Sequence, residues 1–309
     1  MIFQTTLSQM VFLFSLLAIG YLLAKMKLVP DNTEAVLSRL ESDLLIPALV
    51  MDTFIHHFTV EKLMATSDLL LGSILIEIIV IPVSMVLVRF CAKDKYTRNI
   101  YLYGLCFSNF GFMGNAIISM IFPDVFLEYL LFTMILWIVI YIWGAPVLLM
   151  DHGLGSWKET CKTFLNPMFV SMLVGMALGL SGVAVPKFAD QLVASLGDCM
   201  SPLAMLLTGM TVARSKLSEI LKHKSIYVIT AIRLLIYPLI FIAIAQVVPM
   251  SRAFSICALS SLAMPLGLNT IVIPNAYGKD TKIAAGMALV SHLFSCLTIP
   301  IVFFLLLPS

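Results

Sequence analysis

The chain has 309 residues, of which 61% are hydrophobic and only 12% are charged, and its mean hydropathy is +1.03. Soluble domains carry about 25% charged residues, so the composition excludes a soluble protein and predicts an all-α integral membrane protein surrounded by the lipid bilayer. The formal net charge of +2 gives no reason to expect a nucleic-acid partner.

Cysteines and the N-terminus add no special chemistry. The cysteines are scattered and form no C-x-x-C pair, so we expect neither a metal site nor a disulfide framework, and no cofactor. They are Cys91, Cys106, Cys161, Cys199, Cys257 and Cys296. The N-terminus lacks a basic region and a small-residue cleavage site, which predicts that the first apolar run is a retained span.

Apolar runs of about 20 residues have the length of a membrane-spanning helix. In chain order, the sequence predicts ten such spans, at 5–24, 36–56, 67–90, 99–121, 125–149, 165–182, 187–212, 225–248, 253–276 and 282–307. The loops between them are short, and the longest runs from about 150 to 164. We therefore expect no catalytic or ATP-binding domain, and predict a protein that is not an enzyme.

The loop charges predict the orientation of these spans. With both termini outside the cytoplasm, fourteen Lys and Arg residues fall on one side and three (Lys62, Lys187 and Arg252) on the other. Cytoplasmic loops are enriched in Lys and Arg, so the crowded side is predicted to be cytoplasmic. This is the multi-pass arrangement of a protein of the cytoplasmic membrane.

The second half of the chain repeats the first at an offset of 154–156 residues. The matching pairs are Gly20 and Gly175, Pro30 and Pro186, Asp43 and Asp198, Pro47 and Pro202, Pro82 and Pro238, Arg98 and Arg252, and Asn115 and Asn269. Ten spans give five per half, and an odd number places the second copy upside down. The sequence thus predicts two inverted five-helix repeats, 1–150 and 151–309, which are typical of secondary transporters.

Spans four and nine are interrupted at corresponding places. They read SNFGFMGNAIISMIF (108–122) and SLAMPLGLNTIVIPNAYG (261–278), with Gly, Asn and Pro inside apolar runs. A broken helix in the membrane exposes an N-terminal end that attracts an anion. We therefore predict a substrate site centred on Asn115 and Asn269, with Ser108, Asn109, Gly114, Gly267 and Thr270. The alternative is that these residues only allow close helix packing.

These segments resemble the auxin efflux carrier family, which includes plant PIN exporters and bacterial malate or malonate permeases. Further markers are LLIPALVMDTF (44–54) and HLFSCLTIPIVFFLL (292–306). The resemblance implies that broken helices four and nine cross, as in bile acid symporters. It also implies an elevator-type carrier of small organic anions, commonly a homodimer. A scaffold (about 1–65 and 165–214) would support a transport unit (about 66–150 and 225–309).

The resemblance has two departures from the family. Ala116 and Thr270 stand where many relatives carry proline, so Gly114, Pro265 and Gly267 are left to hold the crossover. The long cytoplasmic loop of the plant members is absent, which favours a bacterial carrier of the inner membrane.

Charged residues within predicted spans are functional candidates. Glu77 and Arg233 occupy corresponding positions with opposite sign, which suggests a salt bridge, or a proton-coupled carboxylate beside a substrate-binding cation. The coupling ion is left open between H⁺ and Na⁺, and a sodium-coupled symporter is the nearest alternative. Asp43 and Asp198 suit a gate or a structural role, with Pro47, Pro202 and Pro265. An intramembrane aspartyl protease using this pair is a remote alternative.

Overall fold

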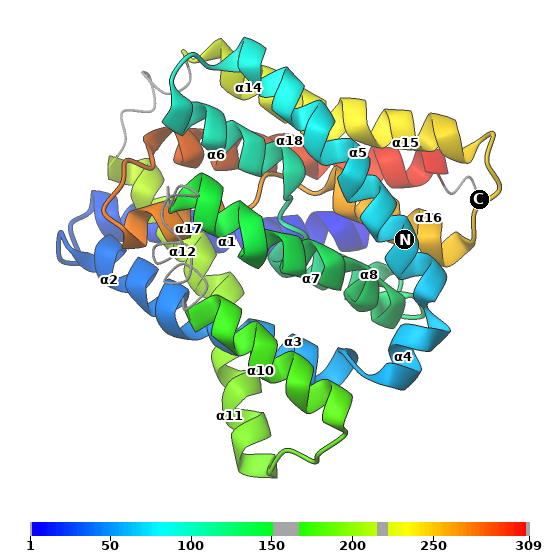
Figure 1. Cartoon of the computed structure of the whole chain (residues 1–309). Coiled ribbons are helices and arrows are strands. Elements are labelled where there is room, and N and C mark those ends of the chain that lie inside the picture. The colour runs from blue at the N-terminus through cyan, green and yellow to red at the C-terminus, as the bar shows by residue number, and fades with distance from the viewer. Residues whose placement is uncertain (1, 151–166, 215–221, 307–309) are drawn as a thin grey trace.

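The computed structural model describes residues 2–150, 167–214 and 222–306, and their regular secondary structure is helical (Figure 1). The predicted repeat boundary at 150/151 coincides with the end of the first described range, and the predicted loop after it lies outside the described residues. Within them, each predicted apolar span begins and ends within a few residues of a helix, and spans four and nine are interrupted at 107–109 and 264–268.

The described part of the first half contains eleven helical segments, of which α4 is a short connecting helix. They are α1 (Ile2–Lys25), α2 (Thr33–Leu40), η1 (Glu41–Leu45), α3 (Ile46–His57), α4 (Val60–Ala65), α5 (Ser67–Cys91), α6 (Lys95–Cys106), η2 (Phe110–Gly114), α7 (Asn115–Ile121), α8 (Phe126–Val139) and η3 (Ile140–Leu149). The segments labelled η are π-helical. Because α2, η1 and α3 follow one another without a gap, they form one long helix.

The described part of the second half repeats this order of long and broken helices. Its segments are α10 (Pro167–Ser181), α11 (Lys187–Asp198), α12 (Met200–Arg214), α14 (Lys224–Ala231), η4 (Ile232–Ile236), α15 (Tyr237–Ala245), α16 (Arg252–Ala263), α17 (Asn269–Ala276) and α18 (Lys282–Leu306). Helices α6 and α16, which precede the two breaks, each have 12 residues.

Five helical stretches are both long and apolar enough to cross a membrane. They are Ser67–Cys91, Phe126–Leu149, Lys187–Arg214, Lys224–Ala245 and Lys282–Leu305, and shorter apolar helices cover Val11–Lys25, Pro167–Ser181 and Arg252–Ala263. The structure is therefore that of an all-helical membrane protein. The full count of ten spans and their inverted relation stay predictions.

Helix α5 shows the polarity expected of a helix in lipid. Its exposed side carries large apolar residues such as Leu75, Ile79 and Phe90, whereas Ser73, Glu77 and Ser84 are buried. Large apolar side chains on the outer surface of a helix are compatible with lipid, whereas polar groups need hydrogen-bonding partners inside the protein. This helix is thus built to face lipid on one side.

Two helix pairs make the most extensive contacts among the described residues, α1 with α12 and α3 with α10. A Cβ atom at Gly20 would overlap the backbone of Leu206, and one at Gly175 would lie 2.9 Å from the carbonyl oxygen of Met51. Small residues let membrane helices approach closely. Gly20 and Gly175 match in the sequence repeat, and each sits in the contact of its own helix pair.

Prolines explain two of the π-helical turns. Pro47 follows η1 and Pro238 follows η4. A proline inside a helix lacks an N–H group, and its ring would clash with the carbonyl group four residues earlier. A wider π turn before the proline removes this conflict, and such turns are frequent at functional sites.

Candidate functional site

The two helix breaks touch each other through their backbones. The first break covers residues 107–109, between α6 and η2, and the second covers 264–268, between α16 and α17. The N–H group of Asn109 donates to the carbonyl oxygen of Pro265 at 2.7 Å, and Ser108 pairs with Leu266 as an isolated antiparallel bridge. The freed backbone groups of one break are thus partly satisfied by the other, as burial in a membrane requires.

Gly267 permits this close approach at the second break. A Cβ atom there would lie 3.0 Å from the carbonyl oxygen of Phe107 and 3.2 Å from that of Ser108. The hydroxyl group of Ser108 adds a further link, donating to the carbonyl oxygen of Ser261 at 2.7 Å. The two breaks therefore form one packed crossover.

Arg233, from η4, binds the ends of both helices that lead into the crossover. Its guanidinium donates to the carbonyl oxygens of Leu105 (2.7 Å), Ser261 and Met264 (3.4 Å), and the side chain is buried, at 1% exposure. Leu105 lies in the last turn of α6, and Ser261 in the last turn of α16. Helix C-terminal ends carry partial negative charge. One buried cation thus neutralises two such ends.

After its break, each broken helix continues as a second half-helix, η2 with α7 in the first and α17 in the second. The N-terminal turns of these two half-helices line a small cavity. Its wall includes Asn109, Phe110, Gly111, Gly267, Leu268 and Asn269, and its volume is about 10 Å³, roughly the room for one water molecule. The first N–H groups of a helix have no partner within that helix, and this end carries partial positive charge. The cavity is therefore suited electrostatically to a negative group, but is closed to a whole organic anion in this conformation.

Two asparagine side chains in the wall of the cavity are held by their amide nitrogens. Nδ2 of Asn269 donates to the hydroxyl oxygen of Tyr103 at 3.0 Å. Nδ1 of His292 lies 2.7 Å from the carbonyl oxygen of Ala288, and must carry the ring proton because a carbonyl only accepts. In the neutral ring, Nε2 then accepts from Nδ2 of Asn109, 3.0 Å away. The Oδ1 atoms of both asparagines are buried without a protein partner.

The predicted site residues separate into two groups. Ser108, Asn109, Gly267 and Asn269 line the cavity, and the hydroxyl group of Thr270 donates to the carbonyl oxygen of Gly267 at 2.8 Å. Pro265 lies in the second break.

Asn115 and Gly114 lie farther along the first half-helix and are not among the residues lining this cavity. Asn115 begins α7 and is half-buried, with its Oδ1 lacking a partner. Gly114 packs against the hydroxyl group of Tyr129, which donates to the carbonyl oxygen of Phe110 at 3.0 Å. The first helix break therefore comes earlier than the match between Asn115 and Asn269 predicts.

Sequence reasoning missed Tyr103 and Trp137, which also line the cavity. Each is one aromatic residue among many in an apolar run, so no local signal distinguishes it. His292, which supports Asn109, is 2% exposed, and both of its ring nitrogens are hydrogen-bonded.

Comparison with known families gives an independent result. The model of a family described as "Membrane transport protein" matches residues 5–159 and 156–303. The chain belongs to this family, the auxin efflux carrier family. No curated protein matches it. This auxin efflux carrier family member is therefore a membrane transporter, as the sequence predicts.

Glu77 and Arg233 of this transporter do not form the direct salt bridge that their corresponding positions suggest. Among the described residues, the acceptors of Arg233 are backbone carbonyls, and Glu77 is not one of them. Glu77 is buried in α5 at 5% exposure, with Oε2 unpartnered. The backbone ends of α6 and α16 use the donors of the cation, which a sequence comparison of side chains does not reveal.

Asp43 and Asp198 lie outside the crossover. Asp43 is exposed and contacts Arg39 at 3.5 Å, and Asp198 is exposed at the end of α11. Pro47 follows the η1 turn and Pro202 lies in the first turn of α12. Among the described residues, no interaction joins the two aspartates, so nothing here resembles the shared carboxylate pair of an aspartyl protease.

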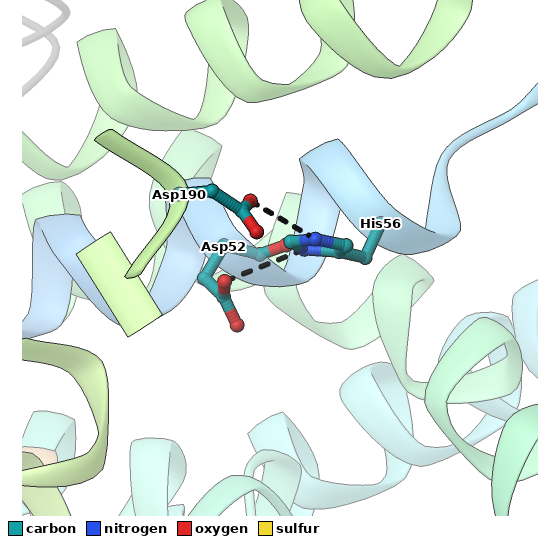
Figure 2. Close-up of side chains that lie close together, drawn as sticks. All are labelled: Asp52, His56 and Asp190. Atoms are coloured by element: carbon teal, nitrogen blue, oxygen red, sulfur yellow. Dashed lines mark hydrogen bonds and ion pairs between the residues drawn. The ribbon is translucent and has the colours of Figure 1, made fainter. Parts of the chain in front are cut away.

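A second polar cluster joins α3 to α11 in this family member. Figure 2 shows the His56 ring between two carboxylates: Nδ1 lies 3.3 Å from Oδ1 of Asp52, and Nε2 lies 3.1 Å from Oδ1 of Asp190. A ligand atom from each residue lies within 4.8 Å of the others, as a metal site requires. However, both ring nitrogens already have neighbours: Nε2 faces the Asp190 carboxylate, and Nδ1 lies between the carboxylate and the backbone carbonyl oxygen of Asp52, 3.0 Å from the latter. The side chains are 30–43% exposed, so we interpret the cluster as a weak surface ion pair.

Proposed function

We propose that the protein is a secondary active transporter that moves a small organic anion across the bacterial cytoplasmic membrane. The substrate would be a mono- or dicarboxylate of the malate, malonate or auxin type, bound where the two broken helices cross. The observation that carries this proposal is the distribution of charge at the crossover: Arg233 neutralises the negative helix ends, and the positive ends line the cavity. The net field at the cavity therefore favours an anion.

The free amide oxygens narrow the class of substrate. Oδ1 atoms of Asn109 and Asn269 are acceptors without partners, whereas the helix N-terminal ends are donors. A ligand that satisfies both carries a carboxylate together with a hydroxyl or a protonated carboxyl group. Hydroxy acids and singly protonated dicarboxylates have this combination.

The packing of the helices supports an elevator-type mechanism. The most extensive helix contacts are those of α1 with α12 and of α3 with α10, and these four helices belong to the proposed scaffold (about 1–65 and 165–214). The crossover helices belong to the proposed transport unit (about 66–150 and 225–309). Since the cavity holds only about one water molecule, substrate entry requires the crossover to open, or its second half-helices to separate. We propose that the protein works as a homodimer, with both termini outside the cytoplasm.

A thermal-shift screen tests the substrate class. Purified protein would be heated with malate, malonate or indole-3-acetate at two pH values, with and without sodium. A ligand that binds only the native state at about 100 times its Kd adds about 2.7 kcal/mol to the free energy of unfolding. We expect malate or malonate to raise the melting temperature. No shift with any of the three anions, in all conditions, would contradict the proposal.

A further inference from the structure

The long helix formed by α2, η1 and α3 carries a buried polar face that the crossover does not explain. Ser38 and Glu41 are 0% exposed and Ser42 is 1% exposed. Both carboxylate oxygens of Glu41 and the hydroxyl oxygens of the two serines have no hydrogen-bond partner. The residues are three and four positions apart, so they lie on one helix face, at the start of the π turn η1.

No basic residue among the described ones pairs with Glu41. Helices α17 and α10 pack on this region and contain no ionisable side chain. Most ionisable groups on the other packed or adjoining helices contact a different partner: Arg214 of α12 contacts Glu34 (2.5 Å), Arg39 contacts Asp43, and Asp52 and Asp190 contact His56. The remaining groups lie away from Glu41. His57 is in the last turn of α3, and Lys187 and Asp198 of α11 are exposed.

A bare carboxylate in this position is expensive. Burial of an ionised carboxyl group without a partner costs several kcal/mol or more, and proteins avoid that cost by neutralising the group. A proton neutralises Glu41 with no coordination shell. A sodium ion would need oxygen ligands on several sides, and the unpartnered oxygens next to Glu41 come from Ser38 and Ser42 on the same helix.

We propose that Glu41 is the proton-binding site that couples this carrier to a proton gradient. The step is the addition of one H⁺ to the Glu41 carboxylate from one side of the membrane and its release to the other side. This inference rests on the proposed elevator mechanism, because Glu41 lies in the scaffold and α17, which packs against its helix, begins at the crossover residue Asn269. The moving unit slides past a neutral carboxylic acid, whereas a charged carboxylate draws water into its contact with α17 and stops this movement.

The first test needs no substrate. Infrared spectra of purified protein at neutral pH would be compared for the wild type, Glu41→Gln and the matched control Glu61→Gln, whose parent residue is exposed in α4. We expect the carbonyl band of a protonated carboxylic acid to decrease in Glu41→Gln and to stay unchanged in the control. Identical spectra for Glu41→Gln and the wild type would overturn the proposal.

The second test measures the coupling. Hydrogen exchange of the peptide covering α17, corrected for its intrinsic pH dependence, should increase severalfold with rising pH in the wild type and stay constant in Glu41→Gln. An equal increase in both would overturn the coupling role. In proteoliposomes loaded for malate uptake, an inward proton gradient should accelerate the wild type and the control but not Glu41→Gln. Absence of malate uptake by the wild type would count against the proposed substrate, while the infrared and exchange results still decide the role of Glu41.

Discussion

The two helix breaks perform the same task with different residues. The second break has five residues, 264–268. Within it, Pro265 disfavours regular helix, and Gly267 permits close contact with the first break. The first has three, 107–109, with neither residue type, and depends on partners elsewhere: Asn109 bonds to Pro265 and to His292. The second break is therefore determined by its own residues, whereas the first is held open by tertiary contacts.

Arg233 is common to both breaks, and its removal should have the largest effect. Arg233→Gln leaves up to three buried carbonyl groups without a charged donor, each at a cost of about 1–3 kcal/mol. We expect a large fall in melting temperature in detergent, and a smaller one for Arg233→Lys, which keeps the charge but cannot span three acceptors. A Gln variant that melts with the wild type would show that the breaks are held independently.

Two glycine substitutions distinguish the breaks. Gly267→Ala places a Cβ atom against the backbone of Phe107 and Ser108, and Gly114→Ala places one against the hydroxyl group of Tyr129. Overpacking of this kind costs about 1–3 kcal/mol. Thermal unfolding should show that Tyr129→Phe partly rescues Gly114→Ala, because the clashing atom is removed. The same change should not rescue Gly267→Ala, and rescue of both would contradict the distinction.

The support of Asn269 can be tested with a smaller change. Tyr103→Phe removes the acceptor of the Asn269 amide group, a hydrogen bond worth about 0.5–1.5 kcal/mol. We expect binding of malate to weaken by about 2- to 10-fold, with little change in the melting temperature. Tyr141→Phe is a control, because the buried Tyr141 hydroxyl group has no hydrogen-bond partner. Equal losses in both variants would argue against this support.

The two helices that lead into the breaks also differ at their starts, far from the cavity. Asp94 caps α6 by accepting from the N–H group of Thr97 at 2.7 Å, and Ser251 caps α16 by accepting from that of Phe254 at 3.2 Å. The hydrogen bond from Thr97 lowers the pKa of Asp94 below its ordinary value. Its stabilisation is therefore complete above the ordinary pKa of about 4 and is lost as the pH falls through the lowered value.

Asp94→Ala should cost about 0.5–2 kcal/mol at neutral pH. The measurement is thermal unfolding between about pH 3 and about pH 7, a range that includes the ordinary Asp pKa of about 4. Asp94→Ser should retain most of the stability but lose its pH dependence in this range. Unchanged pH dependence in Asp94→Ser would show that another acidic group is responsible.

Apolar run length and helix-breaking residues were sufficient to predict the helices and the existence of two breaks. They could not position the first break, because the sequence match pairs Asn115 with Asn269, whereas the cavity brings Asn109 next to Asn269. The backbone leaves the helix at Phe107 because of contacts with the second break, which no local pattern contains. The hydrogen-bond acceptors of Arg233 could not be predicted either, because they are backbone carbonyl oxygens, which every residue carries.

Equilibrium binding of radiolabelled malate to purified variants tests the central claim most directly. The claim is that the substrate binds between the N-terminal turns lined by Asn109 and Asn269. We predict that Asn109→Ala and Asn269→Ala each weaken binding by about tenfold or more, equivalent to about 1.4 kcal/mol, with folding intact by thermal unfolding. Asn115→Ala tests the position that the sequence repeat favours. Wild-type affinity in both Asn109→Ala and Asn269→Ala, or a loss confined to Asn115→Ala, would contradict the account.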